Sequence, residues 1–147
     1  MSERLAMNGG IPVRTAPFGP SHEFGDDEIK ALTQVIRSGI IGKRGPVIDK
    51  FDKEFALRHG AQNAISVTSG TAAMHVCMCA INPDPGDEVI VTPWTAGGSI
   101  IGALFQNCIP VFAEIDHTLN IDPEDVEAKI TPRTRAIIAV HQYGNPC

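Results

Sequence analysis

A short turn between an apolar run and an apolar helix carries the residue types best suited to bind a phosphate group. Ser69 and Gly70 follow the apolar run at 64–67, and Thr71 and Ala72 begin an apolar helical stretch. The first backbone N–H groups of a helix have no partner inside it and lie at the positive end of its dipole, so an anion is favoured there. Gly70 lets the backbone approach an anion closely, and the Thr71 hydroxyl can donate one further hydrogen bond. The same residues also suit plain helix caps, so the turn by itself leaves both interpretations open.

The spacing of the glycines excludes the two common nucleotide-binding loops. A Walker loop requires GxxxxGK[ST], and the chain contains no such run. A dinucleotide fingerprint requires GxGxxG between a strand and a helix, which neither this turn nor the pair Gly97 and Gly98 supplies. Neither kind of nucleotide site is therefore expected.

The turn lies within an alternation of short apolar runs and helix-sized segments. Apolar runs predict strands at 64–67, 88–92, 109–112 and 136–140. Helical periodicity and end signals predict helices at 26–39, 46–59, 99–106 and 123–130, with a further helix from residue 71. This pattern indicates an α/β domain with a mostly parallel sheet and helices on both faces. Glycines and prolines in residues 1–25 predict an extended arm, and residues 26–147 are expected to form the domain.

Polar residues follow two of the predicted strands, at the end where α/β proteins place their sites. His141 and Tyr143 come after the strand at 136–140, and Asp116 comes after the strand at 109–112. His141 could lie near a ligand or be a hydrogen-bonded structural histidine. Asp116 is expected to form a turn and not to act as a catalyst.

Composition narrows the class of partner. The net charge is −5, and no basic run is longer than the pair Lys43 and Arg44, which argues against nucleic acid and against an anionic membrane surface. The amino terminus lacks a signal-peptide pattern and no apolar run is long enough to cross a bilayer, so a cytoplasmic protein with a small-molecule partner is expected. The cysteines show no metal-binding spacing, so no metal site is expected and they are predicted to be buried small apolar residues: Cys77, Cys79, Cys108 and Cys147.

Several segments, in the same order and spacing, resemble the DegT/DnrJ/StrS sugar aminotransferases, which are fold-type I enzymes that use pyridoxal 5′-phosphate (PLP). The resemblance covers essentially the whole chain. It rests on the strings NGGIPVRTAPF, SGIIGKRGP, FDKEFALRHG, SGTAAMH, PGDEVIVTPWT, PVFAEID and ITPRTRAIIAVHQYG. It implies the large domain of an aspartate aminotransferase-like PLP-dependent transferase, present in part.

The resemblance also implies which residues hold the cofactor. Backbone amides and the threonine hydroxyl of one turn would bind the PLP phosphate: Ser69, Gly70, Thr71 and Ala72. The aromatic residue that stacks on the pyridine ring in the family falls on Ala96, which is a departure from the family pattern. Trp94 could supply the stacking face, something smaller could cover the ring, or Trp94 could be a core residue. The loop at 38–45 aligns with one near the active site in relatives, although its composition also suits a plain connector.

For the whole enzyme, the resemblance implies transfer of an amino group from glutamate or glutamine to a keto-sugar or keto-cyclitol, at a site built in a homodimer. The lysine that binds PLP covalently and the aspartate that pairs with its ring nitrogen are expected beyond residue 147, and Lys43 and Lys129 do not match that lysine. No catalytic residue is therefore assigned, and residues 1–147 alone are expected to be inactive. Two alternatives stay open: a PLP-dependent sugar dehydratase of the same fold, with histidine in place of the lysine, and a non-catalytic regulatory or assembly relative, which Ala96 favours.

Overall fold

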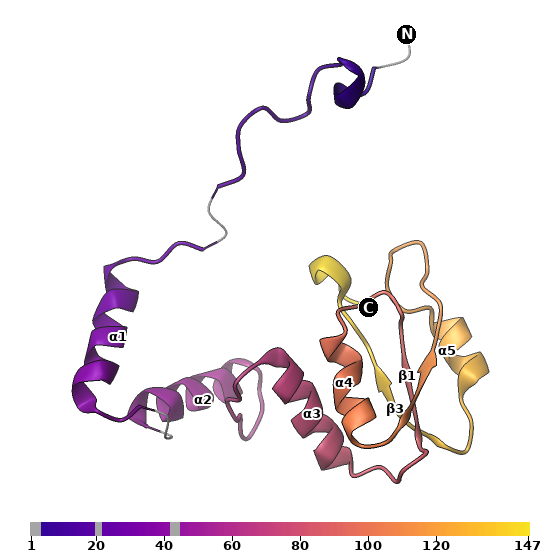
Figure 1. Cartoon of the computed structure of the whole chain (residues 1–147). Helices are drawn as coiled ribbons and strands as arrows, with labels where there is room; N and C mark the ends of the chain where they lie inside the picture. Colours follow the sequence, from indigo (N-terminus) through magenta and orange to yellow (C-terminus); the bar gives the residue numbers. More distant parts are fainter. Residues whose placement is uncertain (1–3, 20–21, 42–44) are drawn as a thin grey trace. The chain divides into compact units, whose positions relative to one another are not determined.

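The computed structural model describes residues 4–19, 22–41 and 45–147, and the chain divides into two units at residues 64 and 65. The first unit contains helices α1 (Asp26–Ser38) and α2 (Pro46–Arg58), both of which confirm the predicted helices (Figure 1). α1 begins where the backbone N–H of Gly25 donates to Glu28 Oε2 at 2.7 Å, and it ends at Gly39, whose φ of 68° is left-handed. α2 begins with Pro46, whose missing N–H costs nothing in the first turn.

The arm that precedes α1 contains one short element that the sequence did not predict. A single 3-10 turn, η1, spans Ala6–Asn8, whereas the glycines and prolines predicted no helical turn in this segment. Gly9 permits it, because this residue adopts a φ of 86° and its N–H donates to Ala6 O at 3.0 Å. The expected domain boundary at residues 25 and 26 stays a prediction.

The second unit is built on a parallel three-stranded sheet with the order β2-β1-β3 (Figure 1). The strands are β1 (Glu88–Val91), β2 (Ile109–Phe112) and β3 (Thr134–Ile138). At the carboxyl end Val91 is in register with Phe112 and Ile138, so all three strands end side by side. A 3-10 turn, η2 (Gln142–Gly144), follows β3.

Helices cover both faces of this sheet, which confirms the predicted fold class. Val89 and Val91 of the central strand point to one face, where they pack with residues of α3 (Gly70–Ile81) and α4 (Gly98–Phe105). Ile90 points to the other face and packs with Val126 of α5 (Pro123–Lys129). This alternation along β1 is the period of a strand, and it makes β1 the buried centre of the unit.

The predicted strand at 64–67 is wrong. The run has no regular secondary structure, and Ile65 is 72% exposed. Strands are stabilised by pairing with neighbours, and the three strands of the sheet pair only with one another in the described chain. Apolar β-branched residues alone therefore did not suffice to form a strand here.

The prediction that the four cysteines are buried is wrong for three of them. Cys77, Cys79 and Cys147 are exposed, and only Cys108 is buried. α3 is apolar around much of its circumference, but Met74 and Met78 are its residues that pack against the core. Cys108 lies in that core, and burial, together with the nearby Asp87 carboxylate, raises the pKa of its thiol.

Ion pairs and hydrogen bonds fix the amino end of the sheet. The buried Glu88 carboxylate accepts hydrogen bonds from Thr131 Oγ1 at 2.6 Å and from Arg133 Nη2 at 2.6 Å. These partners, Thr131 first, lower the pKa of Glu88. The pKa of Asp87 is also lowered, first by a hydrogen bond from the Asp84 backbone N–H and then by Arg135, whose Nε lies 3.0 Å from Asp87 Oδ2.

These lowered pKa values predict that acid weakens the fold. The pKa of Glu88 is lower in the folded chain than in the unfolded chain, so its charge stabilises the fold above the unfolded value of about 4.3, and this contribution is lost as pH falls through the folded value. We expect the free energy of unfolding, measured by denaturant titration, to fall below about pH 4.3. Glu88→Gln should reduce that fall, and the exposed Glu127→Gln should leave it unchanged. Equal pH profiles for Glu88→Gln and the unmodified chain would contradict this assignment.

Candidate functional site

The start of α3 presents backbone donors of the kind that bind an anion. Ser69 is extended, with φ −165° and ψ 165°, and its Oγ accepts a hydrogen bond from the Ala72 N–H at 3.1 Å. The Ala73 N–H donates to Ser69 O at 3.0 Å. The amides of Gly70 and Thr71 have no acceptor in the described part of the chain. The capping role of Ser69 is therefore confirmed, and two amides remain available to a ligand.

Thr71 lies beside the start of α4. A Cβ added to Gly98 would lie 2.6 Å from Thr71 Oγ1, so the two residues are in close contact. One turn further along, a Cβ added to Gly102 would lie 2.9 Å from the backbone of Met74 and His75. Near the other end of both helices, Gln106 Nε2 lies 3.1 Å from His75 Nε2 and 3.1 Å from Cys79 Sγ. The contacts advance in the same direction on both helices, so α3 and α4 run parallel and begin together.

This pairing connects the start of α3 to the carboxyl end of the sheet. The loop between β1 and α4 starts at the buried Thr92, whose Oγ1 accepts a hydrogen bond from the Trp94 N–H at 3.1 Å. The loop is closed by Thr95 Oγ1 and Ser99 Oγ, which lie 2.8 Å apart. The segment at 64–67, which precedes α3, is not a strand of the sheet. The start of α3 is therefore held near the carboxyl end of the sheet by its close contact with α4.

Trp94 and Ala96 both lie on that loop. Trp94 is 45% exposed and belongs to neither core cluster of the described chain, and Ala96 is exposed with its carbonyl accepting the Ser99 N–H at 3.0 Å. An indole with this exposure has a face available for contact. Whether that face covers a cofactor ring stays a prediction.

The loops after β2 and β3 are joined by a residue that the sequence did not single out. Asn120 is buried, its Nδ2 donates to Pro146 O at 3.2 Å, and its Oδ1 accepts the Gln142 N–H at 3.2 Å. These partners follow 22 and 26 residues later in the chain, and no local motif indicates such contacts. Asn120 thereby holds two loops together at the carboxyl edge.

Asp116 confirms its predicted role as a turn former. Its Oδ1 accepts hydrogen bonds from the Thr118 hydroxyl and the Thr118 backbone N–H, which lower the pKa of Asp116. His141 is exposed and its Nδ1 accepts the Cys147 N–H at 3.1 Å, so the structure gives this histidine a partner. Tyr143 is exposed and has a left-handed φ of 51°.

Lys129, one of the lysines considered in the sequence, lies on α5 and not at the start of α3. Lys129 Nζ donates to Phe112 O at 2.8 Å and pairs with Asp125 Oδ2 at 2.7 Å, an arrangement that joins α5 to β2. Lys43 lies outside the described residues, as does part of the loop at 38–45. The described part of that loop continues from α1, where Ser38 Oγ donates to Val35 O at 2.7 Å.

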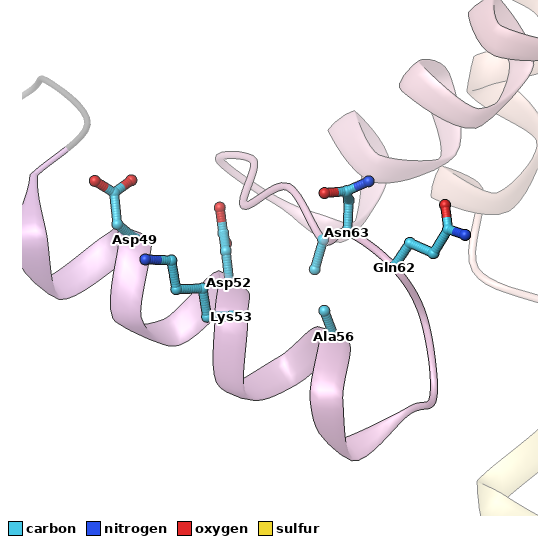
Figure 2. Close-up of a pocket in the computed structure, with 7 residues that line it drawn as sticks. Asp49, Asp52, Lys53, Ala56, Gln62 and Asn63 are labelled. Atoms are coloured by element: carbon cyan, nitrogen blue, oxygen red, sulfur yellow. The ribbon is translucent and has the colours of Figure 1, made fainter.

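A separate pocket of about 240 Å³ lies in the first unit, between α2 and the segment that follows it (Figure 2). The buried Asp52 carries its carboxylate into this pocket from α2. The lining residues are Asp49, Asp52, Lys53, Ala56, Gln62, Asn63 and Ala64. Across residues 4–19, 22–41 and 45–147, no group of three or more His, Cys, Asp or Glu side chains is arranged to hold a metal ion. Nor is any described helix long and apolar enough to cross a membrane.

The start of α3 fits the phosphate of PLP. Gly70 and Thr71 offer two amides without acceptors in the described chain, and the half-buried Thr71 adds a hydroxyl beside them. A Cβ added to Gly70 would meet no atom within 4 Å, so the approach to these amides is open. Backbone amides at a helix start, together with its dipole, form an anion site.

Comparison with known proteins identifies relatives of the chain. The sequence pattern of the DegT/DnrJ/EryC1/StrS aminotransferase family matches residues 22–147. The spore coat polysaccharide biosynthesis protein SpsC of Bacillus subtilis is 44% identical over 125 residues, which are 84% of this chain and 32% of that protein. The L-glutamine:2-deoxy-scyllo-inosose aminotransferase of Streptomyces kanamyceticus is 38% identical over an alignment of 152 positions, which covers 97% of this chain and 35% of that protein. The chain thus spans about a third of the length of these curated relatives.

Solved structures show the same fold. The aminotransferase from Psychrobacter cryohalolentis superposes with a TM-score of 0.84 at 37% identity, covering 89% of this chain and 34% of that one. The E. coli GDP-4-keto-6-deoxy-D-mannose-3-dehydratase with bound hydrated PLP superposes with a TM-score of 0.80 at 29% identity, covering 86% of this chain and 34% of that one.

The contact between α3 and α4 predicts a cost for Gly102→Ala. The added methyl would lie 2.9 Å from backbone atoms of Met74 and His75, which cannot rotate away. We expect the free energy of unfolding to fall by about 1–3 kcal/mol, measured by denaturant titration. Gly97→Ala is the matched control, because a Cβ there meets nothing within 4 Å. Equal stability of the two variants would show that the helices are not in close contact.

Proposed function

Because the chain belongs to the DegT/DnrJ/EryC1/StrS aminotransferase family, we propose that it is the part of an aminotransferase that binds the cofactor phosphate. The complete enzyme transfers an amino group from an amino acid to a keto-sugar or keto-cyclitol. The observation that carries this proposal is the start of α3, where two amides and a hydroxyl have no partner in the described chain and lie beside the carboxyl end of a parallel sheet.

In this proposal PLP is the cofactor, and one turn holds its phosphate. The amides of Gly70 and Thr71 and the Thr71 hydroxyl donate to the phosphate oxygens, while Ser69 and Ala72 fix the turn through the bond from the Ala72 N–H to Ser69 Oγ. When bound, PLP supplies an electron-withdrawing ring that stabilises negative charge at the carbon undergoing amino transfer. The residues of this chain bind and orient that group.

The loop after β1 covers the ring of the cofactor in the proposed enzyme. Trp94 is the only tryptophan in the chain, and it lies two residues before Ala96, the position at which the family carries its stacking aromatic. The exposure of Trp94 supports a shift of the stacking role to this residue.

The substrates are proposed from the relatives. A relative at 38% identity is named for L-glutamine and a scyllo-inosose, which is a keto-cyclitol, and this name supports glutamine or glutamate as donor and a keto-sugar or keto-cyclitol as acceptor. A homodimer in the cytoplasm is the proposed state of the complete enzyme.

Two other functions remain candidates on specific observations. The structural similarity to an E. coli dehydratase favours PLP-dependent sugar dehydration, in which a histidine replaces the lysine of the aminotransferases. Alanine at position 96 favours a non-catalytic regulatory or assembly relative, because it removes a ring contact. The aminotransferase carries a lysine, and the dehydratase a histidine, at the position that binds PLP covalently in the aminotransferases. No position within residues 1–147 corresponds to it.

The proposal is tested by whether the full-length protein retains PLP. The protein is incubated with PLP, gel-filtered and assayed for bound PLP, and then supplied with glutamine or glutamate and a keto-sugar. Retained PLP together with formation of the corresponding 2-oxo acid and of an aminated sugar is the expected result. Retained PLP with dehydration of the keto-sugar and no aminated sugar would favour the dehydratase, and loss of PLP would favour the non-catalytic relative.

Gly70→Asp tests the site itself. The added carboxylate meets no atom within 4 Å and suits the first turn of a helix, so the fold should be kept while the phosphate is repelled. We expect the affinity for PLP to fall by about tenfold or more. Gly70→Ala, which adds a methyl without charge, should lose less affinity for PLP than Gly70→Asp. Equal affinity of the two variants would place the phosphate elsewhere.

A further inference from the structure

We propose that Gly98 is a positioning residue: its missing side chain leaves the space that the phosphate-binding hydroxyl of Thr71 occupies. This inference rests on the proposed function, because it concerns the same phosphate. Gly98 does not touch the phosphate in this proposal and acts only through Thr71.

Only one neighbouring atom, Thr71 Oγ1, lies too close to position 98 for a side chain to fit there. A Cβ at Gly98 would lie 2.6 Å from Thr71 Oγ1, which is closer than real side chains approach, but 3.7 Å from Thr71 Cβ, which is an ordinary contact. The next nearest atom, at 4.0 Å, is Thr71 Cα. The hydroxyl oxygen is therefore the atom that a methyl group at position 98 would displace.

Thr71 has few ways to respond to such a methyl. The side chain is β-branched and occupies staggered χ1 wells, so its Oγ1 leaves one position only by moving to another well. α4 cannot simply move away, because Ala103 lies in the core cluster and Ile100 packs against that cluster. The expected response to Gly98→Ala is therefore a rotation of Thr71 that carries its hydroxyl away from the start of α4.

The position of the hydroxyl matters because the two helices begin together. α3 and α4 run parallel, so the positive ends of both dipoles lie near Thr71 Oγ1. The described chain offers this hydroxyl no hydrogen-bond partner, which leaves it available to a phosphate oxygen. A rotated hydroxyl would lose that bond while the amides of Gly70 and Thr71 kept theirs.

A double-mutant cycle in the full chain as it is encoded tests this role. Affinities for PLP and for pyridoxal, which lacks the phosphate, are measured by equilibrium dialysis, and their ratio reports the phosphate contact alone. Thr71→Ala and Gly98→Ala should each lower the PLP-to-pyridoxal ratio by about tenfold, as expected for a hydrogen bond to a charged group. In the Thr71→Ala background, Gly98→Ala should produce no further loss, because the remaining separation is 3.7 Å.

Two controls separate positioning from general damage. Gly97→Ala, with open space around its Cβ, should keep the ratio unchanged. Gly102→Ala should lower stability equally in the unmodified chain and in the Thr71→Ala background, since its contacts are with the backbone of Met74 and His75. If Gly98→Ala alone does not fold, the double variant should restore folding.

The outcomes distinguish this inference from the proposed function. A wild-type protein without preference for PLP over pyridoxal would overturn both. A clear preference that survives Gly98→Ala would overturn the positioning role alone. So would an equal further loss when Gly98→Ala is added to Thr71→Ala, or a double variant that fails to fold.

Discussion

The close contact between α3 and α4 is the constraint on which the candidate site depends. Gly102 lets the two backbones approach, and Gly98 lets Thr71 lie against the first turn of α4. α4 in turn follows β1, whose Val89 and Val91 are buried beneath both helices. The start of α3 is thereby tied to the buried centre of the sheet, although α3 is preceded by a segment without regular structure.

Much of the helical structure could be predicted because its signals are local. Pro46 sets the first turn of α2, and Gly39 ends α1 in a left-handed conformation. Asp122 caps α5 through a 2.9 Å hydrogen bond from the Glu124 N–H, as its place before Pro123 predicts. Ser69 follows the same rule at α3. The start of α3 and its cap could therefore be predicted from the sequence.

The errors concern contacts between residues far apart in sequence. Residues 64–67 have strand-forming side chains, but pairing depends on which strands lie alongside, and periodicity carries no such information. Cys77 and Cys79 are apolar residues on an apolar helix, yet burial depends on which side of that helix meets the core. The hydrogen bonds of Asn120 and the contact of Gly98 with Thr71 could not be predicted for the same reason, since each links segments more than 20 residues apart.

The donors at the start of α3 are mostly main-chain groups, and this has an evolutionary consequence. A peptide N–H is present whatever side chain the residue carries, so such a surface persists through sequence drift as long as the helix begins at the same place. Diversification among descendants of one ancestor would then fall on the loops, such as that bearing Trp94 and Ala96. A binding site made of main-chain groups, with variable loops around it, allows one fold to acquire new substrates while it continues to bind the same cofactor.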